Sequence, residues 1–213
     1  NMKISEIAKI KKLFICGAGT DETLQIGACY KFAEINNINP KPLKNLYLGN
    51  YAKYIKIKKD NKYKMKKFNK SNQIVDLLLK DQIVAVCRGR MEMGQRSLGN
   101  RSILADPRKI INIQKINESI KQRDFWMPFA PIILYEYQNI LIHNKKKINS
   151  PHMTITFKTK NGKATIPAAI HSSDETTRAQ LLKREENPQL WDVIYMFYKK
   201  TGVPALLNTS FNL

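Results

Sequence analysis

The stretch from Cys87 to Arg108 constrains the fold most, because it places five arginines among three glycines with only two acids. The apolar run Ile83–Cys87 that leads into it predicts a buried strand. Asp106-Pro107 at its end is typical of a helix start, with aspartate as N-cap and proline at the first helical position. Guanidinium groups bind phosphate and carboxylate oxygens through paired N–H donors, and glycine allows a close backbone approach. The pattern indicates an anion site, with surface arginines on a tight hairpin as the alternative.

The charge is unusual, with 37 Lys and Arg against 17 Asp and Glu and a formal net charge of +20. Such a surplus fits a nucleic-acid surface or anionic small substrates. It also fits compositional drift, because lysine, asparagine and isoleucine are all abundant. The longest basic run, Lys56–Lys70, alternates lysine with tyrosine, asparagine, aspartate and methionine. We interpret it as a solvated surface segment rather than an RNA-binding patch.

The three cysteines, Cys16, Cys29 and Cys87, show no metal-ligand spacing. An odd number without a signal peptide indicates a reducing, cytoplasmic environment. No apolar run approaches the roughly 18 residues that span a membrane. The chain also stops on the polar segment Asn208–Leu213 directly after an apolar run. We therefore expect a cytoplasmic protein without membrane association, and a fragment with material missing at both ends.

Near the N-terminus, the apolar run Leu13–Cys16, the loop Gly17–Thr23 and the periodic segment Leu24–Glu34 predict a strand, a glycine-containing loop and a helix. This order suits a nucleotide, because a helix N-terminus attracts anions. Thr20 or Asp21 is the expected N-cap. Asp21 could instead bind a metal, although the residues alone favour the cap.

The rest of the chain predicts helices and strands in alternation after a polar linker over 37–70. The expected elements are a helix from about Ser71, a strand over 83–87, a short strand, a helix over 108–120, a strand with a short helix over 132–141, a strand over 153–157, a helix from Asn187-Pro188 to Gly202 and a strand over 203–207.

Two further groups of polar side chains indicate ligand contacts. Lys121 and Arg123 would point the same way on an extended backbone and so attract an anion. A basic helix C-terminus explains them equally well. The amides and hydroxyls of Asn208–Asn212 directly follow the last predicted strand, and ligands bind at the carboxyl edge of such sheets.

Three segments in this order, GRMEMGQRSLGNRSILADPR, KQRDFWMPFAP and LLNTSFN, resemble the carbamoyltransferases that modify antibiotics and nodulation factors. The resemblance extends over essentially the whole chain. It implies an α/β fold in which residues 71–213 form a C-terminally truncated YrdC-like domain, a twisted mixed sheet with flanking helices. Residues 37–70 would be a linker. Residues 1–36, with CGAGTDETLQIGA, would close an actin-like carbamoyl-transfer domain.

The resemblance implies ATP-dependent activation of carbamoyl phosphate to a carbamoyl-adenylate, followed by transfer to a hydroxyl of an acceptor, a sugar or natural product. Its cofactors would be ATP, Mg²⁺ and, in the actin-like domain, Fe²⁺ or another divalent metal. Its partners would be carbamoyl phosphate, ATP and a hydroxyl-bearing small molecule, with no nucleic acid and no membrane, and homodimerisation left open. The alternatives are a YrdC-like module for RNA binding or tRNA modification, and an inactive fragment.

The resemblance also assigns roles to side chains at the family's motif positions. They comprise the catalytic residues Lys121, Arg96 and Ser210, the substrate- and nucleotide-binding residues Arg123, Arg178, Asn208 and Asn212, and the metal ligand Asp21. Arg96, Lys121 and Arg178 would hold phosphate oxygens. Asn208 and Ser210 would fix the carbamoyl or α-phosphate end.

Other positions are expected to support this site or depart from the family pattern. Arg90 and Arg101 would brace the loop through its backbone or through Glu92. The departures are Gln95 for a usual proline, Met127 for a frequent arginine and Thr23 for a glycine beside Asp21. The histidines that complete the family's metal site lie in an N-terminal region absent from this chain, so the fragment is expected to lack transfer to the acceptor.

Overall fold

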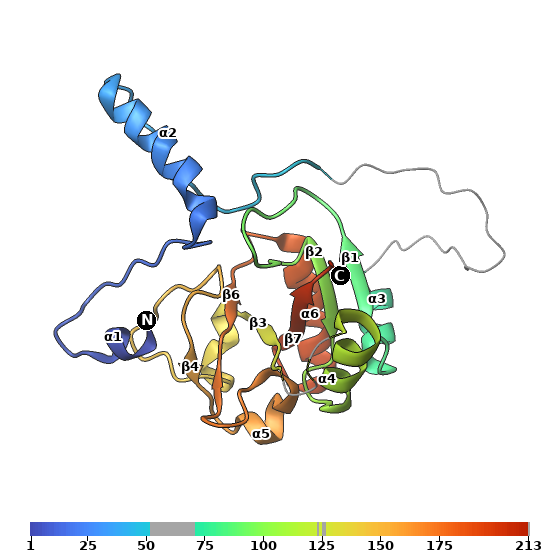
Figure 1. Cartoon of the computed structure of the whole chain (residues 1–213). Coiled ribbons are helices and arrows are strands. Elements are labelled where there is room, and N and C mark those ends of the chain that lie inside the picture. The colour runs from blue at the N-terminus through green and yellow to red at the C-terminus, as the bar shows by residue number, and fades with distance from the viewer. Residues whose placement is uncertain (52–70, 123, 125–126, 213) are drawn as a thin grey trace, which may run out of the picture.

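The computed structural model describes residues 1–51, 71–122, 124 and 127–212, and its centre is a five-stranded mixed sheet (Figure 1). The strand order is β1-β2-β7-β3-β6. Only β3 and β6 pair in parallel; the other neighbours are antiparallel. The strands are β1 (Val84–Cys87), β2 (Arg101–Ala105), β3 (Ala130–Leu134), β6 (Gln180–Leu182) and β7 (Ala205–Ser210). The predicted α/β class with a mixed sheet is confirmed.

Helices cover both faces of this sheet. On one face, α3 (Ser71–Leu79) and α6 (Pro188–Thr201) pack over a large apolar cluster. A smaller cluster on the other face lies beneath α4 (Ile111–Ile116) and the 3-10 turn η4 (Pro167–Ala169). Successive residues of β2 serve the two cores in turn, because side chains alternate across a strand: Ile103 and Ala105 belong to the smaller cluster and Leu104 to the larger one.

The helix α6 follows its sequence pattern closely. Leu190, Val193, Ile194 and Phe197 recur at helical spacing and are all buried. Asn187 caps the helix by accepting a hydrogen bond from the Leu190 N–H at 3.2 Å. Both the capped start and the glycine-ended finish match the prediction.

Some predicted elements are wrong in extent. The predicted strand over 153–157 is reduced to β4 (Phe157–Lys158), which pairs with β5 (Thr176–Thr177), and Met153 has a φ of 57°. Asp106 accepts from the Arg108 N–H and forms a turn, so the next helix begins only at Ile111. The strand β1 lies at the sheet edge and is only partly buried. The last strand extends to Ser210, further than expected.

The remaining described elements, apart from the short strand pair β4 and β5, are helices and helical turns. They are the 3-10 helices η1 (Asp21–Thr23) and η3 (Tyr135–Ile140), the π-helical turn η2 (Asn117–Lys121), and the helices α1 (Met2–Glu6), α2 (Leu24–Ile35) and α5 (Gly162–Thr165). None of the described helices has the length and apolar character needed to cross a bilayer. Cys16, Cys29 and Cys87 are all exposed and unpaired.

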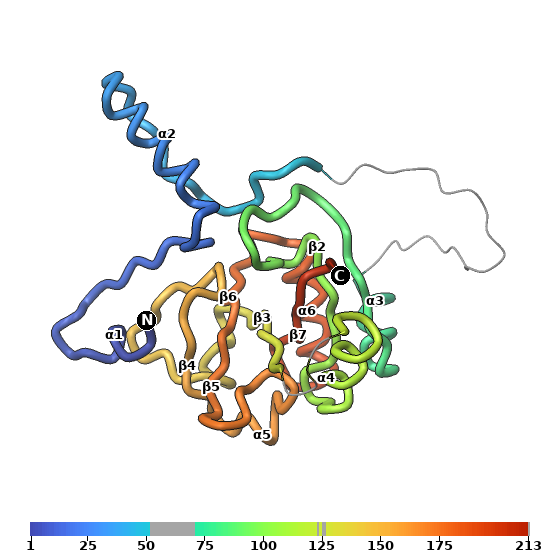
Figure 2. The backbone as a smooth tube through the Cα atoms, in the orientation of Figure 1, coloured from blue at the N-terminus to red at the C-terminus, as the bar shows by residue number. Residues whose placement is uncertain are grey.

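The N-terminal part departs from the prediction in another way. Leu13–Cys16 forms no strand. The helix α2 is present, with Thr20 as the N-cap of the preceding η1, but it projects from the body of the molecule (Figures 1 and 2). Of its residues only Ala33 is buried, while Leu24 and Ile35 are each 68% exposed. The periodicity predicted the helix correctly, but the described residues do not cover its apolar side chains.

Two glycines allow a matched test of packing around α6. Gly99 and Gly202 both have positive φ, 108° and 75°, which costs a residue with a Cβ about 1 kcal/mol or more. A Cβ on Gly99 would clash with Leu190 Cδ2 in the buried core, whereas a Cβ on Gly202 would meet nothing within 4 Å. We expect Gly99→Ala to lower the free energy of unfolding by about 2–3 kcal/mol and Gly202→Ala by about 1 kcal/mol. Urea unfolding of both variants measures the difference, and equal losses would contradict the packing described.

Candidate functional site

The arginine-rich loop connects β1 and β2 and is held from outside by a segment of the predicted linker. Residues 46–51, here called the strap, run alongside residues 90–93. The Gly49 N–H donates to the Met91 carbonyl and the Met91 N–H to the Asn50 carbonyl, both at 2.9 Å. The Met93 N–H donates to the Leu46 carbonyl at 2.8 Å. The strap therefore pairs with the loop much as a neighbouring strand would.

Side chains strengthen this pairing. Arg90 donates to the carbonyls of Leu48 and Gly49 at 2.8 and 3.0 Å. The Tyr47 hydroxyl donates to the Leu98 carbonyl at 2.8 Å. Burial raises the pKa of Tyr47 to about 12, so the phenol keeps its proton at neutral pH. The strap therefore fixes the outer side of the loop through contacts within the protein alone.

Most arginines of the stretch have structural partners. Arg101 pairs with Glu92, with 3.1 Å between Nε and Oε2, and Arg108 pairs with Asp106 at 2.6 Å. Together with the Arg90 contacts, this confirms that Arg90 and Arg101 brace the loop, although Arg90 does so through the strap. Arg88 is half-buried, and its Nε and Nη2 have no hydrogen-bond partner among the described residues.

Arg96 differs from these, because it lines a cavity of about 100 Å³ together with Arg178. Both residues are exposed, so solvent reaches the cavity. Within the part of the chain that the structure describes, neither guanidinium makes a hydrogen bond or ion pair. The cavity is also lined by Asn208 and Ser210 of β7. The fold thus brings four of the predicted residues together from three separate segments.

The electrostatics of this cavity favour an anion. Although Arg178 is exposed overall, desolvation lowers the pKa of its guanidinium, and the nearby charge of Arg96 lowers it further. Two like charges held close together repel each other, and no described acid lines this cavity. A phosphate or carboxylate placed between them would remove that repulsion and accept hydrogen bonds from both guanidiniums.

Asn208 connects the loop to the central strand. It lies in β7 opposite Leu104 of β2 and Ala130 of β3. Its amide donates to the Ser97 carbonyl at 2.8 Å and accepts from the Ser97 hydroxyl at 3.2 Å. Because Asn208 is buried and Ser97 is the neighbour of Arg96, these two bonds fix the base of the arginine.

Lys121 is the last residue of η2, and its ammonium lies beside the carboxyl end of β7. This ammonium contacts four oxygens: the Ser210 carbonyl at 2.5 Å and hydroxyl at 3.2 Å, and the Asn212 carbonyl at 2.6 Å and amide oxygen at 2.8 Å. The Ser210 hydroxyl also contacts the Asn212 amide oxygen at 2.5 Å. Three predicted residues, Lys121, Ser210 and Asn212, therefore form one polar cluster, with Ser210 shared between it and the arginine cavity.

A second cavity of about 340 Å³ adjoins the first, and Arg178 and Phe129 line both. Its other lining includes His171, Thr176 and Met127. Many members of the resembled family carry arginine at the position of Met127. In this chain Met127 borders the larger of these two cavities with an apolar side chain. Gln95, the position of the usual proline, lines the smaller one.

The metal assignment has less support in the described residues. Asp21 is exposed at the start of η1, beside Thr23. Among the described residues no three His, Cys, Asp or Glu side chains gather into a metal-binding group. Asp21 offers a carboxylate, but these residues alone do not form a complete divalent-metal site.

Two sequence interpretations fall outside the described residues. Arg123, the partner predicted for Lys121, is one. The basic run Lys56–Lys70 is the other. Both remain predictions.

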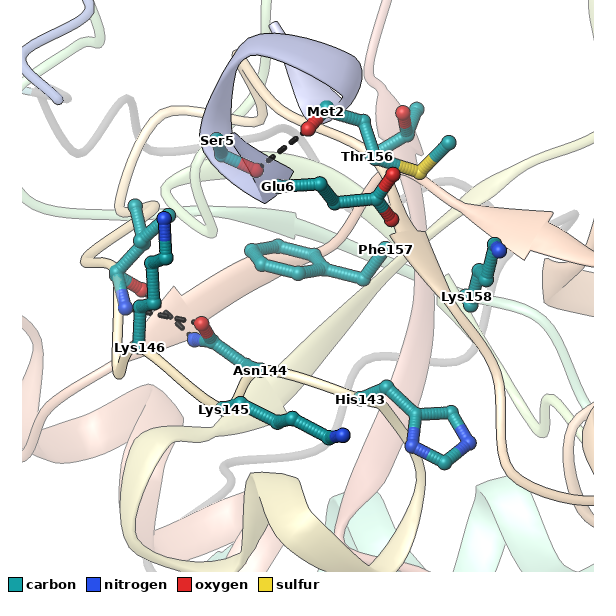
Figure 3. A pocket seen from close by; sticks show the side chains of 11 residues that line it. Met2, Ser5, Glu6, His143, Asn144, Lys145, Lys146, Thr156, Phe157 and Lys158 are labelled. Carbon is teal, nitrogen blue, oxygen red and sulfur yellow. Dashed lines mark hydrogen bonds between the residues drawn. The ribbon is translucent and has the colours of Figure 1, made fainter. Parts of the chain in front are cut away.

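A further cavity of about 410 Å³ lies between α1 and the segment 143–148. Figure 3 shows the Phe157 ring between Glu6 on one side and His143 and Lys145 on the other. Lys146 ties this region to the N-terminal segment by donating to the Ile7 and Ile10 carbonyls at 2.7 and 2.8 Å. No predicted site residue lines this cavity.

The sequence missed several residues that build the arginine cavity. Ser97 and Phe129 line it, and Met153 closes it from a segment predicted as a strand. Ser97 lies inside the quoted motif, so its proximity to Arg96 could have drawn attention. Phe129 and Met153 are ordinary apolar residues, and nothing in their local pattern distinguishes them from core positions.

Comparison with known proteins agrees with the motifs. Residues 75–213 match the family model described as Carbamoyltransferase C-terminus. An uncharacterized protein of Methanocaldococcus jannaschii is 36% identical over 225 residues, covering 100% of this chain and 42% of the relative. Nodulation protein NolO of Bradyrhizobium diazoefficiens is 38% identical over 143 residues, covering 67% of this chain and 26% of the relative.

A third relative carries an enzyme name. The 3'-hydroxymethylcephem-O-carbamoyltransferase of Amycolatopsis lactamdurans is 34% identical over 131 residues, which cover 62% of this chain and 24% of that protein. The chain therefore spans less than half the length of each of these relatives.

Proposed function

Because the chain belongs to the carbamoyltransferase family through its C-terminal domain, we propose that it binds carbamoyl phosphate and ATP and forms a carbamoyl-adenylate. The adenylate then carbamoylates a hydroxyl of a small-molecule acceptor. The observation that supports this most is the pair of guanidiniums, Arg96 and Arg178, which line one cavity with no acid among the described residues to neutralise them. Both substrates are polyanions, so such a pair suits their phosphate groups.

The proposed reaction has three steps. Water first cleaves the P–O bond of carbamoyl phosphate and releases phosphate, leaving carbamate. A carbamate oxygen then attacks the α-phosphorus of ATP, a new P–O bond forms, and pyrophosphate leaves. The acceptor hydroxyl finally attacks the carbamoyl carbon and AMP leaves. Negative charge grows on transferring and leaving oxygens in these steps, so fixed cations lower the barrier.

The proposed role of each residue follows from its place in the site. Arg96 and Arg178 hold phosphate oxygens in the smaller cavity, and Asn208 and Ser210 lie on its β7 wall. Lys121 at the strand end exchanges one of its four oxygen contacts for a phosphate oxygen, since an ammonium has only three N–H donors. Arg123 and Asn212 extend the contacts to the nucleotide.

The adjoining cavity of about 340 Å³ takes the remainder of the nucleotide. Its size fits a nucleoside better than another phosphate, and Met127 gives its wall an apolar surface. Mg²⁺ would accompany ATP and neutralise the phosphates. We assign the sheet and its helices to a YrdC-like domain and residues 1–36 to the end of an actin-like domain. Asp21 would contribute one carboxylate to the metal site of that domain.

Carbamoyl-phosphate-dependent exchange of pyrophosphate into ATP tests the proposal on the purified chain. We expect exchange with carbamoyl phosphate and Mg²⁺, and little with acetyl phosphate, which cannot supply carbamate. Direct calorimetric titration with pyrophosphate reports on the anion site separately. Exchange that does not depend on carbamoyl phosphate, or no exchange by a chain that does bind pyrophosphate, would contradict adenylate formation.

A further inference from the structure

Glu92 is the most constrained acid in the arginine-rich loop. Its side chain is 0% exposed. One carboxylate oxygen accepts hydrogen bonds from the backbone N–H groups of Leu98, Asn100 and Arg101 at 2.8, 2.8 and 3.1 Å. The other oxygen accepts from Arg101 Nε at 3.1 Å, and Arg101 Nη2 donates to the Glu92 carbonyl at 2.7 Å.

These bonds close a small ring in the chain. Residues 93–97 connect Glu92 to Leu98, and the Glu92 carboxylate accepts a hydrogen bond from the Leu98 N–H, which closes the ring. Arg96 lies within this ring, and the adjacent Ser97 is fixed separately by Asn208. The direction of Arg96 therefore depends on two anchors, the buried carboxylate and the β7 amide.

The carboxylate also occupies a site that would otherwise attract ligand. Three backbone N–H groups that converge on one point form an anion-binding nest. Here a side chain of the same loop fills that nest. An incoming phosphate therefore binds the guanidiniums of Arg96 and Arg178 rather than the backbone N–H groups, which Glu92 already occupies.

We propose that Glu92 is a positioning residue, which fills the backbone nest of the loop and thereby directs Arg96 into the cavity that it lines with Arg178. This inference rests on the proposed function, because it assumes that the cavity binds phosphate groups. The charged state of Glu92 persists in the folded protein. Burial acts to raise its pKa, but the three N–H donors outweigh burial and leave the pKa below the ordinary value.

The test measures pyrophosphate affinity by calorimetry, with and without formate, whose carboxylate can replace the missing one. We expect Glu92→Ala to bind pyrophosphate at least about tenfold more weakly, and about 50 mM formate to recover at least about threefold by filling the empty nest. Glu92→Gln keeps a carbonyl oxygen for the three N–H groups. It should bind pyrophosphate within about threefold of the wild type, although it loses the ion pair to Arg101.

Asp106→Ala is the matched control, because Asp106 is also 0% exposed and pairs with an arginine, Arg108, at the other end of β2. It should lower stability without changing pyrophosphate affinity and without a response to formate. Wild-type affinity in Glu92→Ala, or no formate recovery, would overturn the positioning role while leaving the proposed function intact. If Glu92→Ala does not fold, Glu92→Gln decides, and a loss of more than about threefold overturns the role. If the wild-type chain does not bind pyrophosphate, the proposed function fails and the role with it.

Discussion

Replacing Arg178 with alanine is expected to reduce carbamoyl-phosphate-dependent ATP–pyrophosphate exchange by about 100-fold or more. Arg178 and Arg96 line one cavity without a neutralising acid among the described residues, so under the proposed function removal of either leaves developing negative charge with one fixed cation fewer. Arg178→Lys should retain part of the activity, because lysine keeps the charge but loses the two parallel N–H donors. Initial exchange rates over a range of carbamoyl phosphate concentrations measure the effect.

The control for Arg178 is Arg184→Ala. Arg184 is exposed, pairs weakly with Asp192 at 3.5 Å and lies over the Trp191 ring, away from both candidate cavities. An exposed pair of this kind contributes little, so activity should stay within about twofold of the wild type. A folded Arg178→Ala variant with wild-type exchange would remove Arg178 from the site.

The second large effect is expected for Lys121→Met, which keeps the length and apolar stem of the side chain but removes its ammonium. The four oxygens of Ser210 and Asn212 that surround the ammonium would lose their common donor, and the incoming phosphate would lose a cation. We expect exchange to fall by about 100-fold. Ser210→Ala should cost less, about tenfold, because Lys121 keeps the Ser210 carbonyl and the Asn212 oxygens.

Measured kcat and KM separate two explanations for Lys121. If the ammonium acts on the transition state, kcat falls while pyrophosphate affinity changes little. If it only orders the chain end, thermal stability falls and both constants change together. Lys163→Met is the control, because Lys163 is 70% exposed, pairs with Glu175 and lines neither the arginine cavity nor the adjoining cavity. An effect of Lys163→Met equal to that of Lys121→Met would indicate a general loss of positive charge.

The sequence predicted the elements that combine a strong pattern with a clear boundary. The helix from Asn187-Pro188 to Gly202 is one, since its cap, periodicity and terminal glycine all agree. The resemblance to carbamoyltransferases also placed Arg96, Arg178, Asn208 and Ser210 in one site, which no local pattern could do. These residues come from segments far apart in the chain and meet only because β7 lies in the middle of the sheet.

The incorrect predictions share a physical cause. Met153, Ile155 and Phe157 are all buried, so their alternation with threonines reports burial correctly. The segment nevertheless pairs as a strand only at Phe157–Lys158, because a ladder needs a neighbouring backbone, which alternation does not encode. The helix α2 shows the converse, since its periodicity is real although the described residues leave its apolar side chains exposed. The nest around Glu92 was invisible for a similar reason, because backbone N–H groups carry no sequence information.

The strap determines where the molecule can be cut. The family match begins at residue 75, but the backbone that completes the arginine-rich loop lies at residues 46–51. A shortened chain limited to the family match would leave the N–H groups of Met91 and Met93 and the carbonyl of Met91 without their partners. It would also remove Leu46 from the apolar cluster that it forms with Leu98 and Met153. An unpaired edge of this kind recruits backbone from other molecules. The smallest unit suited to crystallisation or titration therefore starts before Leu46, and self-association of shorter pieces would reflect the excision rather than the native protein.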